Sequence, residues 1–254
     1  MPICEGSYVL FYHQRNKTWL TKITGTSKLH THIGIIDFSK IIGLEFGSSI
    51  YTPKGKLVHL LEPTLFDFVM KSERKTQIIY PKDLGYIAAR TGLQSGFKIL
   101  EVGTGSAALT TYFAGLVKPE GHIFTYDVNE EFMRIAKKNL EKVGLDKYVT
   151  MKKYGGNGYC EKEIDAAIID LGDPWSVLPL VHTSLKSSGA VTAICPTMNQ
   201  LEKTADTLEK VGFVDIECSE IISRNIEARM GKTRPSMRMV GHTTYLIFAR
   251  KISI

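Results

Sequence analysis

The strand-to-helix junction near residue 100 constrains the fold most, because two apolar runs meet there across a glycine turn with no linker between them. Residues 97–102 predict a buried strand, and residues 107–116 predict an apolar helix. Gly103 and Gly105 lie between them, in a tight turn where glycine adopts backbone conformations that other residues disfavour. A strand that leads directly into a helix predicts a parallel sheet covered by helices.

The same alternation continues toward the end of the chain. Residues 129–143 carry apolar side chains at three- and four-residue spacing and stop at Gly144, which predicts an amphipathic helix. The last two predicted strands have no comparable helix between them, which favours an antiparallel addition at one edge of the sheet. The further predicted strands are residues 123–127, 166–170, 190–195, 213–218 and 245–250, and a further helix is residues 199–211.

The first 75 residues have a different pattern. Short alternating segments at 7–12, 19–24 and 57–61 are separated by Gly, Asn and Lys clusters, which predicts small β structure with turns. One short helix is predicted after Pro63. We therefore expect two domains, a small β-rich domain at 1–75 and a larger α/β domain at 76–254.

Composition excludes several classes of protein. The 254 residues are 43% hydrophobic and 23% charged, as in ordinary globular chains. No apolar run approaches the roughly 18 residues of a membrane helix, and the N-terminus lacks the pattern of a signal peptide, so a cytoplasmic protein is expected.

The net charge of +6, concentrated in the first third, permits a polyanionic partner. The cysteines are far apart without C-x-x-C pairs, so no metal site is expected, and their redox state is left open: Cys4, Cys160, Cys195 and Cys218.

Two acidic residues accompany the glycine turn. Glu101 directly precedes it, and Asp127 ends the next predicted strand, where a carboxylate accepts ribose hydroxyls. The third glycine of a dinucleotide site is replaced by Ala108, and a carboxylate repels a pyrophosphate but attracts an ammonium group. The pattern favours S-adenosylmethionine as the cofactor. The alternative is an ordinary strand–helix turn without a ligand.

A third predicted strand ends in IIDLGDPW, residues 168–175. Methyl transfer to a ring nitrogen of adenine benefits from an acceptor for the exocyclic amine, whose acidity rises as the ring becomes positive. Asp170 is the candidate for that role. The alternative is an acidic strand-end cap, with Asp173 and Pro174 starting a turn.

Four motifs occur in one order: QIIYPKD (77–83), VGTGSAALT (102–110), IDLGDPW (169–175) and RPSMRMVGHTTYLIFARK (234–251). Together they resemble the tRNA (adenine-58-N1)-methyltransferases of the archaeal and bacterial homo-oligomeric type, over essentially the whole chain. The QIIYPKD element is the most specific part, since the glycine turn is shared by most class I methyltransferases. The resemblance implies a Rossmann-like α/β fold with a seven-stranded, mostly parallel sheet, S-adenosylmethionine as donor, tRNA as acceptor, and a tetramer.

The resemblance also assigns roles to residues. Ser106 to Leu109 would hold the methionine end of the cofactor, Asp127 the ribose, and Tyr80 would shape the target-base pocket unless it is a core tyrosine. Asn157 takes the place of an expected adenine-contacting acid. The expected catalytic residues are Asp170 and Tyr80, and the expected cofactor-binding residues are Gln77, Glu101, Gly103, Gly105, Ser106, Ala107, Ala108, Leu109, Asp127, Asn157 and Asp170. Ala107 replaces a family glycine, which we expect to be tolerated where the backbone enters the helix.

The segment RNIEARMGKTRPSMR (224–238) holds five basic residues and one acidic residue. It lies between the last two predicted strands, where phosphate contacts are expected, although a solvated loop explains many such runs. The expected RNA contacts are Lys82, Arg224, Arg229, Lys232, Arg234 and Arg238, with the basic N-terminal domain as a second surface. Two alternatives stay open, a class I methyltransferase with another acceptor such as isoaspartyl protein, and a non-catalytic tRNA-binding subunit. Modification of adenine 57 is also left open.

Overall fold

The computed structural model describes residues 1–14 and 17–253. The backbone contacts divide the chain into two compact units, Met1–Ser72 and Glu73–Ile254, so the division falls three residues before the one expected. Each unit has its own buried core.

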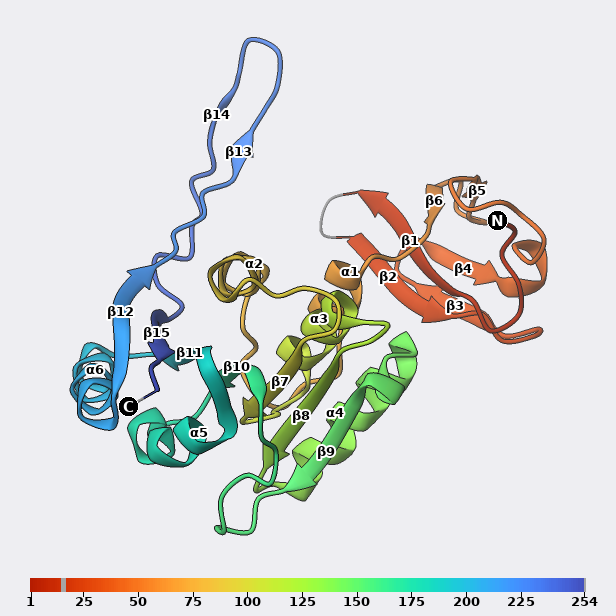
Figure 1. The fold of residues 1–254 in the computed structure, drawn as a ribbon. Coiled ribbons are helices and arrows are strands. Elements are labelled where there is room, and N and C mark those ends of the chain that lie inside the picture. Colours follow the sequence, from red (N-terminus) through yellow and green to blue (C-terminus); the bar gives the residue numbers. More distant parts are fainter. Residues whose placement is uncertain (15–16, 254) are drawn as a thin grey trace. The chain divides into compact units, whose positions relative to one another are not determined.

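The first unit is built from antiparallel β structure around a mostly aliphatic core (Figure 1). Phe11 and Phe38 stack in it with ring centroids 6.1 Å apart. Thr64 begins a short helix with a capping box to Asp67, as the sequence after Pro63 predicts. A four-stranded sheet has the order β2 (Lys17–Lys22), β1 (Tyr8–Gln14), β6 (Leu57–Leu61) and β5 (Ser49–Tyr51), and beside it are the hairpin β3 (Lys28–Thr31) and β4 (Gly34–Asp37), η1 (Phe38–Lys40) and α1 (Leu65–Met70).

The second unit contains a seven-stranded, mostly parallel sheet among the residues described (Figure 1). Its order is β12 (Phe213–Glu220), β15 (Tyr245–Lys251), β11 (Leu185–Cys195), β10 (Ile164–Ile169), β7 (Lys98–Val102), β8 (His122–Asp127) and β9 (Val149–Lys153). Strand β15 is antiparallel to both of its neighbours, β11 and β12. The closing pair of strands therefore makes an antiparallel addition at one edge of the sheet, as predicted: β15 is the antiparallel strand of the pair, and β12 is the edge strand.

Helices connect these strands and bury the faces of the sheet. Leu100 and Val102 of β7 share a core with Val181 and Leu208, which come from two different helices. The helices are α2 (Pro81–Thr91), α3 (Ala108–Val117), α4 (Glu130–Val143), α5 (Leu178–Ser184) and α6 (Met198–Val211), with the short turns η2 (Asp146–Tyr148) and η3 (Pro174–Ser176). Among them, α2 and α5 were not predicted from the sequence, although Pro81 at the first position of α2 and Gly92 at its left-handed C-cap are typical helix boundaries.

Residues 221–244, which join β12 to β15, form a projecting segment that we call the arm (Figure 1). A two-residue ladder joins β13 (Ile226–Glu227) to β14 (Arg234–Pro235) and makes the arm a hairpin. Large apolar side chains on it face solvent, with Met230 and Met237 at 102% and 82% exposure. None of the helices described is long and apolar enough to cross a membrane.

Candidate functional site

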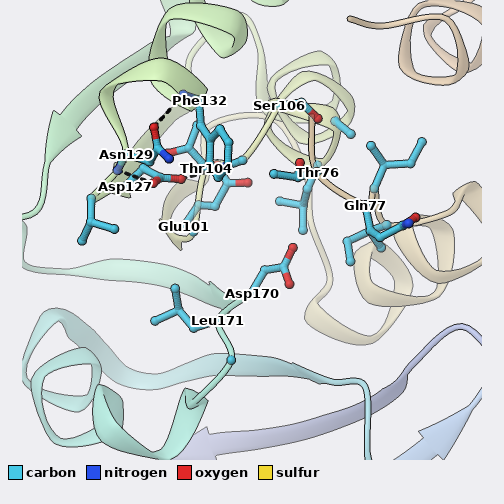
Figure 2. Close-up of a pocket in the computed structure, with 18 residues that line it drawn as sticks. Thr76, Gln77, Glu101, Thr104, Ser106, Asp127, Asn129, Phe132, Asp170 and Leu171 are labelled. Atoms are coloured by element: carbon cyan, nitrogen blue, oxygen red, sulfur yellow. Dashed lines mark hydrogen bonds between the residues drawn. The ribbon is translucent and has the colours of Figure 1, made fainter. Parts of the chain in front are cut away.

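The carboxyl ends of β7, β8 and β10 meet around a cavity of about 370 Å³ (Figure 2). Chain connections leave β7 toward β8 on one side, while β10 lies on the other, and ligands bind at such switch points in open α/β sheets. The lining includes Thr76, Gln77, Glu101, Gly103, Gly105, Ser106, Ala108, Leu109, Asp127, Asn129, Phe132, Asp170 and Leu171. The fold therefore collects side chains from four separate sequence segments into one site.

The glycine turn after β7 depends on glycine at its first position. Gly103 has a φ of +100°, and a Cβ placed on it would lie 2.1 Å from the carbonyl oxygen of Asp170. Its backbone N–H donates to the carbonyl of Tyr126 at 2.8 Å. The turn is thus packed directly against the ends of both neighbouring strands, and a side chain at Gly103 would separate them.

Ala107 occupies the last position of the turn, and its backbone differs from the expectation. It is the N-cap of α3 with a φ of +61°, in the left-handed region rather than entering the helix. An alanine there costs roughly 1 kcal/mol relative to glycine. Its buried methyl group offsets part of that cost. Ala107 is in the turn but does not line the cavity.

Asp127 at the end of β8 holds the turn and the next helix together. Its Oδ2 accepts from the backbone N–H of Gly105 at 2.9 Å, and its Oδ1 accepts from that of Asn129 at 2.8 Å. Asn129 in turn caps α4 by accepting from Glu131 and Phe132 (Figure 2). Each carboxylate oxygen keeps a lone pair free, so Asp127 presents two acceptors to the cavity.

Glu101 is buried near the end of β7 and lines the cavity. Burial raises the pKa of its carboxyl to about 8, although a hydrogen bond from Thr110 Oγ1 at 2.7 Å opposes the shift. The charges of Asp170 and Asp127 add to the increase. A positively charged group placed beside Glu101 would reverse this effect and favour the carboxylate.

Asp170 follows β10 and faces two cavities. Besides the first, it lines a second cavity of about 330 Å³ that also includes Tyr80, Asp83, Pro196 and His242. Its carboxylate accepts no hydrogen bond from the residues that the structure describes. Burial raises the pKa of Asp170 to about 6, with a contribution from the charge of Asp127. A partly desolvated carboxylate without a protein partner is available to a ligand in either cavity.

Two predicted residues lie elsewhere than expected. Asn157 is exposed in the loop after β9 and lines neither cavity, so its assignment to the cofactor is not supported by its position. Lys82 is 17% exposed and donates to Asp83 at 2.7 Å and to Thr243 at 2.7 Å, so its ammonium already has two partners within the protein. Tyr80, which was expected in a pocket for the target base, lines the second cavity and not the first.

The remaining predicted RNA contacts are on the arm. Arg224, Arg229, Lys232 and Arg238 are exposed there. Arg234 is exposed as well, but its guanidinium pairs with Glu227 at 3.2 Å across the hairpin. The arm thus brings together the basic residues that the sequence groups between 224 and 238.

Sequence reasoning missed several residues of the first cavity. Thr76 directly precedes the QIIYPKD motif, and its hydroxyl is buried without a hydrogen-bond partner in the described structure. Phe132 fits the apolar face of a helix, so its place in the lining was not recognised. Asn139 of α4 donates to the carbonyls of Glu73 at 2.8 Å and of Ser106 at 2.9 Å, which ties the segment before the motif to the glycine turn. The position of Thr76 next to a motif was the available signal.

Comparisons with known proteins agree with this geometry. The model of the family described as "tRNA methyltransferase complex GCD14 subunit" matches residues 56–233. The tRNA (adenine(57)-N(1)/adenine(58)-N(1))-methyltransferase TrmI of Methanocaldococcus jannaschii is 35% identical, with 96% of this chain and 95% of the relative covered. The catalytic subunit TRM61 of the tRNA (adenine(58)-N(1))-methyltransferase of Candida albicans is 31% identical, with 91% of this chain and 71% of the relative covered.

Two solved structures of methyltransferases are also similar to this chain. A SAM-dependent O-methyltransferase of Thermotoga maritima superimposes with a TM-score of 0.95 at 36% identity, covering 99% of this chain and 95% of the other. The tRNA (m1A58) methyltransferase TrmI of Aquifex aeolicus has a TM-score of 0.87 at 34% identity, with both chains covered completely. The fold is that of the class I SAM-dependent methyltransferases. This chain belongs to the family of tRNA methyltransferase complex GCD14 subunits.

Proposed function

We propose that this protein transfers a methyl group from S-adenosylmethionine to N1 of adenine 58 in the T-loop of tRNA. The observation that carries the proposal is the position of Asp170. Its carboxylate lines two adjoining cavities and accepts no hydrogen bond from the described residues. One cavity holds the features of a cofactor site, and the other is open for a base. The family membership and the names of the relatives support the same reaction.

The lining of the first cavity fits S-adenosylmethionine. Glu101 lies where a cationic amine would be neutralised, and Asp127 offers two acceptors to a ribose diol. Phe132, Val128 and Leu171 supply apolar surface for a purine ring. The unpartnered hydroxyl of Thr76 lies against Gly105, 3.3 Å from the position of a Cβ there, and is available to a polar group of the ligand.

Methyl transfer requires that the methyl donor and the adenine are positioned for direct attack, and that one protein group accepts a hydrogen bond from the exocyclic amine of the adenine. Held between Glu101 and Asp127, S-adenosylmethionine would supply an electrophilic methyl group for attack by the lone pair of adenine N1. The ring then carries a positive charge, and its exocyclic amine becomes more acidic. Asp170 accepts a hydrogen bond from that amine and stabilises the developing charge. Tyr80 lines the same cavity and provides an aromatic wall for the base.

Replacing Asp127 by Asn is expected to weaken cofactor binding by about ten- to a hundredfold, because a charged acceptor contributes about 1.5–3 kcal/mol. The amide keeps one acceptor oxygen in place of two, so the backbone N–H groups and the ribose compete for it. Calorimetry of S-adenosylmethionine binding measures the change. The matched control is Glu130→Gln, an exposed carboxylate outside the cavity that pairs with Lys153. Equal affinity in the two variants would contradict the role of Asp127.

The arm is the proposed tRNA surface, with the basic N-terminal unit as a second one. Adenine 58 lies within the folded T-loop, so it must leave its stack at a cost of a few kcal/mol. Phosphate contacts by Arg224, Arg229, Lys232 and Arg238 would supply that energy.

Removing two arm charges is expected to lower the salt dependence of tRNA binding. In an Arg229→Ala, Arg238→Ala variant, the slope of log affinity against log salt should fall by about 2, because each phosphate contact contributes about 0.9. Filter binding over a range of salt concentrations measures the slope. The control is Lys137→Ala, Lys138→Ala on α4, which removes the same charge from another exposed surface. Identical slopes in both double variants would place the RNA elsewhere.

We also propose a cytoplasmic homotetramer. The exposed apolar side chains of the arm support a protein contact, since large patches of this kind mark interaction sites. Light scattering of the purified protein gives the mass directly, and a monomer at micromolar concentration would contradict the proposal.

Transfer of a labelled methyl group tests the function. Labelled cofactor is incubated with an unmodified tRNA transcript, with a transcript lacking adenine 58, and with one lacking adenine 57. Label that depends on adenine 58, recovered as 1-methyladenosine, is the expected result. Label on a ribose or protein oxygen would support the O-methyltransferase activity named for the Thermotoga maritima structure. Cofactor binding without transfer to RNA would support a partner-dependent subunit.

A further inference from the structure

His242 stands at the base of the arm and contacts two other segments of the second unit. Its Nδ1 lies 2.6 Å from Oε1 of Glu220, the last residue of β12, where the arm begins. Its Nε2 lies 3.0 Å from the carbonyl oxygen of Pro196, directly after β11. The ring of Tyr245, at the start of β15, lies 4.5 Å from its own. His242 therefore joins the two ends of the arm to the strand next to them.

The two partners favour the doubly protonated ring. A carbonyl oxygen and an ionised carboxylate are both acceptors, so both ring nitrogens must carry hydrogen for the two bonds to form. Neutral imidazole has one N–H and can satisfy only one of them. The hydrogen bonds to Glu220 and Pro196 raise the pKa of His242, while desolvation and the charge of Lys82 of α2 oppose the shift. The Lys82 charge is itself paired with Asp83, so the net surroundings favour the imidazolium.

This ring belongs to the wall of the second cavity, which the proposed catalytic residues also line. His242, Thr243 and Pro196 line that cavity together with Tyr80 and Asp170. The next residue, Thr243, donates to Asp83 Oδ2 at 3.2 Å and accepts from Lys82 at 2.7 Å, at the start of α2. The end of the arm is thereby fastened to the helix that begins beside Tyr80.

We infer that His242 is a positioning residue for methyl transfer: as an imidazolium it fastens the arm to the wall of the base cavity, and loss of its proton loosens that wall. The inference rests on the proposed function for its catalytic readout. The pKa of His242 is raised in the folded protein. Its two hydrogen bonds, to Glu220 and Pro196, are therefore fully formed below the ordinary histidine pKa of about 6.5, and they are lost as the pH rises through the raised value. Asp170 must be ionised, which limits activity on the acid side near its pKa of about 6.

The pH profile of kcat tests the inference with three variants. In the wild type, kcat should decline on the acid side at about pH 6 and on the alkaline side at a pH above about 6.5. His242→Gln should lower kcat by about tenfold, as for loss of one hydrogen bond, and remove the alkaline limb while leaving cofactor affinity unchanged. Glu220→Gln should move the alkaline limb to lower pH, because the imidazolium loses its charged partner. The matched control is His122→Gln, whose ring contacts Thr150 at 2.7 Å at the amino end of β8 and should leave both limbs in place.

A second measurement separates this inference from the proposed function. Nuclear magnetic resonance titration of histidine rings, with His242 assigned by the His242→Gln spectrum, follows protonation without any substrate. A His242 pKa above the ordinary value, lowered in Glu220→Gln, is expected even if the acceptor is not tRNA. A neutral His242 at pH 7, or an alkaline limb that persists in His242→Gln, would overturn the inference. Absence of methyl transfer by the wild type would instead overturn the proposed function.

Discussion

Replacing Asp170 by Asn is expected to lower kcat for methyl transfer by about a thousandfold, within the range for loss of an acid–base group or a charge-stabilising group. Asn keeps the size of the side chain but presents an amide with no negative charge to the adenine ring. Because the carboxylate accepts no hydrogen bond from the described residues, the substitution leaves no protein donor unsatisfied. Cofactor affinity should change far less than kcat. Single-turnover transfer and calorimetry on the same protein measure the two quantities.

The pH dependence of the wild type provides an independent check on Asp170. Its pKa of about 6 means that the acceptor is lost as the pH falls through that value, so kcat should decline on the acid side near 6. In Asp170→Asn the residual activity should show no such limb. The control is Asp173→Asn, an exposed carboxylate in the same strand-end segment that lines neither cavity. A comparable loss of activity in both variants would assign the effect to the segment and not to the Asp170 carboxylate.

Replacing Gly103 by Ala is expected to destabilise the second unit by about 3 kcal/mol, from left-handed strain and overpacking together. The added Cβ would lie 2.1 Å from the carbonyl oxygen of Asp170, so the turn and the end of β10 must separate. That separation also displaces the residue proposed to carry catalysis, so activity should be lost along with stability. For a unit of this size the melting temperature should fall by about 10 °C.

A glycine in the same cavity provides the comparison. Gly172 lines the first cavity, yet a Cβ on it meets nothing within 4 Å. Gly172→Ala should therefore change the free energy of unfolding by no more than about 0.5 kcal/mol. Urea denaturation followed by far-ultraviolet circular dichroism compares the two variants. Equal stability would mean that the Gly103 turn relaxes without cost.

Local patterns in the sequence were sufficient for most of the elements. The i, i+3, i+4 spacing that ends at Gly144 predicts α4, and the structure places that helix at Glu130–Val143. The glycines at 103 and 105 predict the turn after β7, and both lie in the left-handed region. Such signals are readable because helix periodicity and positive φ depend on neighbours within a few residues.

The differences from expectation concern residues whose environment depends on distant segments. Lys82 was predicted to contact RNA, but Thr243, 161 residues away, accepts from its ammonium. Asn157 was assigned to the cofactor by its place after a strand, while the loop carries it into solvent. Whether a polar side chain faces a partner or water is decided by which elements pack against it, and no local pattern encodes that.

The sequence by itself determined the alternation of strands and helices, the glycine turn, and the acidic residues at three strand ends, because each is a property of a short segment. Only the tertiary structure decided that β7 lies between β8 and β10, which brings Glu101, Asp127 and Asp170 around one cavity. It also placed β15 inside the sheet and the base of the arm beside Asp170. Strand order and long-range contacts follow from the burial of whole faces of the sheet, which sums over the entire chain and is not visible at any single position.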